Sequence, residues 1–185
     1  MMRYFILRDD VTIPNRWHLG EVSPGNDEEP LELWVGKRMQ NNKTLFTEIT
    51  DPGRSLDFCL TSFATPVATT KLASAIEAIA GDDVQRLPVY IKGHEGFEVL
   101  NAVRVLECLD EDRSKFLKWT EKDHRADLAG EYRSIPLLRI RSAEVPNDAH
   151  FFRIKGSFIE LIVSEDVKLA MEDAGCLGAK FQDVT

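Results

Sequence analysis

The chain has 185 residues, of which 43% are hydrophobic and 29% are charged, as in an ordinary globular protein that buries a sizeable core. Its formal net charge of −8 at pH 7 disfavours nucleic acid and anionic membranes as partners, because either would repel the average surface. No apolar run approaches the roughly 20 residues needed to cross a bilayer. The three cysteines are far apart and lie in apolar runs, which indicates buried thiols in a cytoplasmic protein.

Residues 1–60 predict a β-rich N-terminal part, followed by an α+β core over residues 61–185, and the two are expected to form one compact unit. In the N-terminal part, Trp17 is expected to anchor an irregular segment, and the polar residues 23–30 predict a surface loop. Asp51-Pro52-Gly53 is typical of a type II turn, in which the glycine has a positive φ. Short strands are expected at residues 4–7, 31–35, 45–49 and 56–63.

Residues 69–110 predict a helix followed by two long strands, and this stretch organises the rest of the chain. Thr69 and Thr70 are candidate N-cap residues, and Gly81 suits the left-handed position that ends a helix. The apolar stripe of the helix is formed by Leu72, Ile76, Ile79 and Ala80.

The two strands of this stretch are expected at residues 84–91 and 97–109, joined by a hairpin connection that contains two glycines. Pro88 cannot donate to a ladder, so it predicts an open side or a bulge in the first strand. The second strand is apolar on both faces, which predicts an inner strand of the sheet with a bulge or bend near Asn101 and Ala102.

The C-terminal third predicts a polar segment, four strands and a second helix. Residues 113–133 are expected to form a short helix and a long loop. Ser164 is the expected N-cap of the second helix, with Glu165 and Asp166 in the first turn and Gly175 at the end. Strands are expected at residues 132–140, 151–154, 157–163 and 179–184. The predicted fold class is α+β, with a mixed or mainly antiparallel sheet and two short helices packed on it.

The sequence predicts no catalytic, cofactor-binding or metal-binding residue. The histidines lack metal-ligand spacing, and His94 and His124 are expected to be solvated. A thiolate–imidazole pair between Cys108 and His94 is disfavoured because Cys108 lies in an apolar run. Residues 110–112 are interpreted as an acidic turn, and Arg104 is expected to pair with a carboxylate because its neighbours are apolar.

Several runs in order carry a resemblance to a known family. They are residues 11–20, with Pro14, Arg16-Trp17-His18-Leu19 and Gly20, and residues 52–58, 66–85, 99–110 and 161–175. Together they resemble immunity protein family eleven of bacterial polymorphic toxin systems, formerly a domain of unknown function. The resemblance implies a cytoplasmic protein that binds a cognate toxin and blocks it without catalysis. It brings no catalytic or interface residues to carry over.

Charge suggests where a basic toxin, such as a nuclease, would be bound, because complementary charge steers association. The part of the chain from Glu160 onwards is rich in carboxylates, and Trp34 flanks a polar loop, where an aromatic side chain suits an interface. The candidate interface residues are Asp27, Glu28, Glu29, Trp34, Glu165, Asp166, Glu172 and Asp173.

Two other classes of function remain open on the sequence. One is an enzyme with a scattered active site around His94, Arg104 or Asp110, which requires these side chains to converge in a deep pocket. The other is a small-ligand-binding or self-associating module, which requires a dry pocket or a large symmetric interface.

Overall fold

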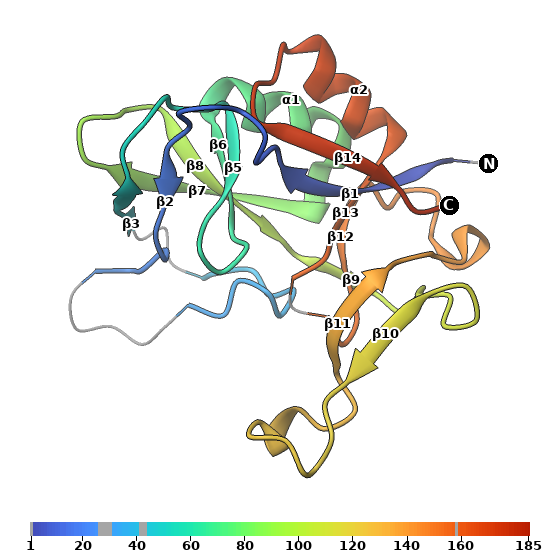
Figure 1. Ribbon diagram of the computed structural model, residues 1–185. Helices are drawn as coiled ribbons and strands as arrows, with labels where there is room; N and C mark the ends of the chain where they lie inside the picture. Colours follow the sequence, from blue (N-terminus) through green and yellow to red (C-terminus); the bar gives the residue numbers. More distant parts are fainter. Residues whose placement is uncertain (1, 26–30, 41–43, 158) are drawn as a thin grey trace.

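The computed structural model describes residues 2–25, 31–40, 44–157 and 159–185, and it confirms the predicted α+β class (Figure 1). The helices are α1 (Thr70–Ala80) and α2 (Glu165–Asp173). The strands are β1 (Tyr4–Asp9), β2 (His18–Leu19), β3 (Leu45–Thr47), β4 (Ile49–Asp51), β5 (Phe58–Leu60), β6 (Pro66–Thr69), β7 (Val84–Ile91), β8 (Phe97–Ala102), β9 (Arg104–Leu106), β10 (Lys115–Lys118), β11 (Tyr132–Leu137), β12 (Phe151–Ile154), β13 (Leu161–Ser164) and β14 (Ala179–Asp183).

Most strands belong to two five-stranded sheets. The terminal sheet has the strand order β14-β1-β13-β12-β9, and the central sheet has the order β3-β7-β8-β6-β5. β2 and β4 form a short ribbon, and β10 and β11 form a hairpin, here called the arm, that projects away from both sheets (Figure 1). α1 and α2 lie side by side on the opposite side of the molecule from the tip of the arm (Figure 1).

Both helices begin where the sequence predicts. The Thr69 hydroxyl accepts a hydrogen bond from the amide of Leu72, and the Ser164 hydroxyl accepts one from the amide of Val167 at 3.3 Å. The buried side of α1 differs from the predicted stripe, because Ala73 is buried while Ile79 is exposed. Within the described residues, no helix has both the length and the apolar character that crossing a bilayer requires.

The predicted inner strand over residues 97–109 is two strands in two different sheets. β8 lies between β7 and β6 in the central sheet, whereas β9 is the edge of the terminal sheet and runs parallel to β12. The chain changes sheets at Val103, whose amide donates to the Asp83 carbonyl at 2.9 Å. Where a bend was expected, the chain therefore passes from the central sheet to the terminal sheet. The prediction of one continuous strand is wrong because the side chain of Arg104 pairs with carboxylates outside the central sheet.

Three local predictions in the loops need correction. Residues 31–35 form an irregular segment with a turn and not a strand. Residues 113–133 contain the unpredicted strand β10, and the expected short helix is only a 3₁₀ helix at Ala126–Leu128. Gly53 lacks the positive φ of a type II turn. A glycine is needed there for another reason: an added Cβ would lie 2.5 Å from the backbone carbon of Arg16.

The first strand of the chain lies inside the terminal sheet, between two of its last strands. β1 pairs with β13 on one side, with Tyr4 opposite Ser164, and with β14 on the other, with Phe5 opposite Asp183. Both pairings are antiparallel, and the N- and C-termini consequently emerge on the same side of the molecule (Figure 1).

Candidate functional site

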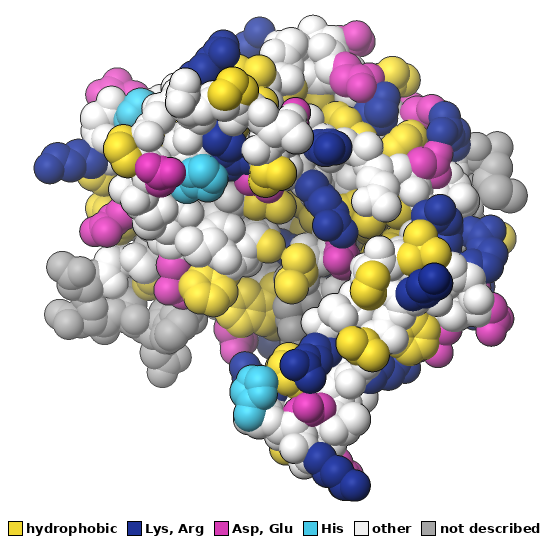
Figure 2. Space-filling view, viewed as in Figure 1, with side chains coloured by type: hydrophobic (Ala, Val, Ile, Leu, Met, Phe, Trp, Pro, Cys, Tyr) yellow, Lys and Arg dark blue, Asp and Glu magenta, His cyan; other side chains and the backbone are white. Residues whose placement is uncertain are grey.

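An open groove lies between the two sheets and the tip of the arm, with a volume of about 1060 Å³. It is lined by the β2–β4 ribbon, the turn that contains Trp34, the β5–β6 turn, the arm tip around Leu128, and Ile159 before β13. Figure 2 shows hydrophobic side chains gathered below the centre of this face, above the arm. Two of the lining side chains, Phe63 and Ile159, are 62% and 61% exposed. Large apolar side chains that cluster in a hollow are typical of a binding surface.

The β5–β6 turn is built to present Phe63 to solvent. The amide of Ala64 donates to the Thr61 carbonyl at 2.9 Å, and the amide of Thr61 donates to the Thr65 carbonyl at 3.0 Å. Ala64 has φ 54°, a left-handed conformation that costs a non-glycine residue about 1–2 kcal/mol. Backbone strain of this kind persists where the surrounding structure fixes it, and it concentrates at functional sites.

A buried arginine lies beneath the groove and ties two of its walls together. Arg153 donates from Nη1 to the Ile159 carbonyl at 3.3 Å and from Nη2 to the Ala64 carbonyl at 3.4 Å. Burial lowers the pKa of Arg153 to about 10, and the nearby carboxylate of Glu160 opposes that shift. One guanidinium thus fixes segments that are far apart in the sequence.

Glu160 is part of this support and not of the predicted acidic surface. Its side chain is buried, and it accepts from Nη2 of Arg8 at 3.2 Å. Burial raises the pKa of Glu160, and the positive charge of Arg8 partly offsets this by lowering it. The sequence shows Glu160 only as one carboxylate in an acidic stretch, so its burial between two arginines was missed.

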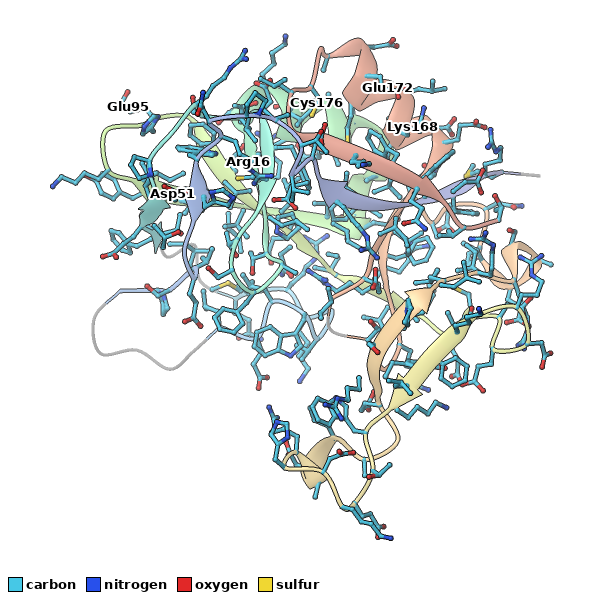
Figure 3. The ribbon with its side chains drawn as sticks, viewed as in Figure 1. Arg16, Asp51, Glu95, Lys168, Glu172 and Cys176 are labelled. Atoms are coloured by element: carbon cyan, nitrogen blue, oxygen red, sulfur yellow. The ribbon has the colours of Figure 1, made fainter. Side chains whose placement is uncertain are left out.

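The predicted acidic residues of α2 are not among its buried residues, Val167 and Met171, and Figure 3 shows Glu172 on the side of the molecule away from the arm. Glu165 pairs with Arg3 at 3.5 Å, and Glu172 pairs with Lys168 at 2.8 Å. Asp166 and Asp173 are exposed and have no ion pair within the described residues. α2 therefore carries two carboxylates that are open to a partner and two that already have one.

The other candidate interface residues do not join those of α2. Trp34 is half-buried and lines the groove. The segment 31–40 that contains it runs below the central sheet in Figure 1, whereas the helices lie above that sheet. Asp27, Glu28 and Glu29 lie outside the described residues. The structure therefore separates the predicted surface into an acidic helix and an apolar groove.

The side chains that suggested a catalytic site are engaged elsewhere. Arg104 has the predicted carboxylate partners, Asp83 at 2.6 Å and Asp148 at 3.1 Å. Burial raises the pKa of the Cys108 thiol to about 12, and His94 packs against Trp17, which belongs to a different hydrophobic cluster from Cys108. The ring of His94 packs 4.8 Å from that of Trp17 and is half-buried, so its predicted solvation is wrong, whereas His124 is exposed as expected.

The acidic run 110–112 forms ordinary surface ion pairs. Asp110 pairs with Arg113 at 3.0 Å, and Glu111 pairs with Lys118 at 2.8 Å. Across the described ranges, no group of three or more potential metal ligands comes together. The interpretation of this run as an acidic turn accounts for its contacts.

The exposed side chains of the groove were missed because their segments were interpreted as strands. Residues 56–63 and 157–163 both predict strands, which placed Phe63 and Ile159 inside a sheet. A local signal did exist at the first position, where Phe63 is surrounded by Thr61, Ser62, Ala64 and Thr65, a composition that favours a turn.

Comparison with known proteins identifies a family. The family model of the immunity protein family Imm11 matches residues 92–185, a range that contains the arm, α2 and every strand of the terminal sheet except β1. This range includes Ile159 and the arm tip but not Trp34 or Phe63. A search of curated proteins found no match.

Proposed function

Because the chain belongs to the Imm11 immunity protein family, we propose that it is a cytoplasmic antidote that binds one cognate protein toxin and blocks it without catalysis. The family match carries this proposal. The net charge of −8 supports a basic toxin, for example a nuclease, because opposite charge raises the association rate. The same charge disfavours nucleic acid and anionic membranes as partners.

The first test is co-expression of the chain with the toxin encoded by the adjacent gene. Cells that produce both proteins are expected to grow, cells that produce the toxin alone are expected to stop growing, and the two proteins are expected to purify as a stable complex. Growth arrest in the presence of the chain, together with no complex from the purified proteins, would contradict the proposal.

The exposed carboxylates of α2 are proposed to steer the toxin toward the chain. Changing Asp166 and Asp173 to lysine is expected to lower the association rate about tenfold at low salt, because the attraction between the proteins is weakened. At high salt the difference from wild type is expected to shrink, because exposed charges are screened. Stopped-flow association kinetics at two ionic strengths provide the measurement.

A matched variant separates steering by α2 from the effect of net charge. Glu48 and Asp112 are also exposed carboxylates, outside α2, and changing both to lysine alters the net charge by the same amount. This control is expected to slow association less than the α2 variant. Equal slowing by the two variants would show that α2 has no special role.

A further inference from the structure

We infer that the groove anchors the toxin and receives an apolar side chain that is flanked by basic residues. This inference rests on the proposed function and adds the surface and the chemistry of contact. It assigns the groove a role in holding the complex together, whereas the carboxylates of α2 raise the rate at which the toxin associates.

The first argument is the apolar area that the groove leaves open. Phe63 and Ile159 face solvent across the same hollow, and half-buried Trp34 lines it as well. Tightly bound protein interfaces concentrate their binding energy in a few large side chains that become fully desolvated at the centre of the contact. A groove of about 1060 Å³ has room for a protruding side chain of a partner together with its neighbours.

The second argument is the charge at the rim. The described lining residues include the carboxylates of Asp9, Glu32 and Asp127 but only one guanidinium, that of Arg125. Arg125 is already held by Asp127, with its Nη2 donating at 2.7 Å, and Asp9 is bonded to Arg16 at 2.6 Å. Glu32 is exposed at this rim. With these two pairs formed, the carboxylate of Glu32 is left at the rim of the apolar hollow, where it complements a partner that carries Lys or Arg beside an apolar side chain.

The third argument is that the walls are fixed before a partner arrives. The Arg153 guanidinium holds the carbonyls next to both exposed side chains, at Ala64 and at Ile159 itself. Because the Ala64 backbone is also locked in a left-handed turn, little conformational freedom is left to lose on binding. Such preorganisation is what a high-affinity anchor site requires.

The test compares the affinity of the purified toxin for four chains: wild type, Phe63→Ala, Ile159→Asp and Leu117→Ala. Leu117 is the matched control, since it is 62% exposed on β10 and does not line the groove. Phe63→Ala and Ile159→Asp are each expected to raise Kd about tenfold or more, mainly through faster dissociation. Leu117→Ala is expected to bind as wild type. All positions are exposed, so unchanged thermal unfolding is expected to confirm that the variants fold.

The outcomes separate this inference from the proposed function. If wild type binds the toxin and the two groove variants bind equally well, the groove is not the anchor and only this inference is overturned. If wild type does not bind the toxin at all, the proposed function fails and the inference fails with it. If the groove variants instead abolish self-association of the free chain, measured by light scattering, while toxin binding persists, the groove joins two copies and the inference is again overturned.

Discussion

Replacing Asp83 by alanine is expected to lower the free energy of unfolding by about 3–5 kcal/mol, because it removes a buried carboxylate that accepts from two backbone amides and from Arg104. The side chain of Asp83 is only 3% exposed and lies 2.6 Å from Nε of Arg104. Its carboxylate also accepts from the amides of His150, at 2.7 Å, and Phe151, at 3.3 Å. Alanine would leave Nε of Arg104 and two backbone amides without their acceptor. Urea unfolding followed by circular dichroism measures the change.

Asp148 provides the control for this variant. It binds the same guanidinium at 3.1 Å, but its side chain is 77% exposed. Asp148→Ala is expected to cost much less than Asp83→Ala, because water replaces an exposed partner. Similar losses for Asp83→Ala and Asp148→Ala would contradict the conclusion that Asp83 holds β9 to the start of β12.

Replacing Gly178 by alanine is expected to lower the free energy of unfolding by about 4 kcal/mol, since backbone strain and overpacking act together. Gly178 has φ 113°, and an added Cβ would overlap the carbonyl oxygen of Phe58. The neighbouring Leu177 carbonyl accepts from the amides of Asp57, at 2.9 Å, and Phe58, at 3.2 Å. These bonds join β5 at the edge of the central sheet to the start of β14, so the backbone has little room to move away. The change is measured by urea unfolding.

Gly175→Ala separates the two contributions to that loss. Gly175 also has a positive φ, 73°, but an added Cβ would meet nothing within 4 Å. Only the strain of about 1–2 kcal/mol is expected there. A loss at Gly178 no larger than the loss at Gly175 would mean that the close approach to β5 relaxes easily.

The features that the sequence predicts well are those encoded by a few neighbouring residues. The hydroxyls of Thr69 and Ser164 mark the start of each helix, because a capping side chain bonds to a backbone amide three residues away. The strand at residues 151–154 has its predicted bounds, since Phe151, Phe152 and Ile154 are apolar and a turn precedes them. Such signals act within one turn or one strand, so they do not depend on the rest of the fold.

The features that were missed depend on pairing between distant segments. The residues around Val103 do not indicate that the chain changes sheets there. The change depends on ion pairs of Arg104 with Asp83 and Asp148, which lie elsewhere in the sequence. The groove was missed for the same reason. Its support is Arg153, which meets the carbonyls of Ala64 and Ile159 only after both sheets have formed. Trp34 was predicted as an interface residue from its position beside a polar loop, but Phe63 and Ile159, which line the same groove, were not predicted.

The place of β1 has a consequence for the order in which the fold is completed. β1 is synthesised well before its two neighbours in the terminal sheet, which pair with it at Ser164 and Asp183. Contacts of such long sequence separation form slowly, because a large loop must close first. A nascent chain that lacks its last strands leaves both edges of β1 unpaired, and so it cannot complete the layer that supports Arg153 and α2. The terminal sheet therefore closes only after the segment up to Asp183 has been synthesised, so any surface that depends on this sheet forms late in folding.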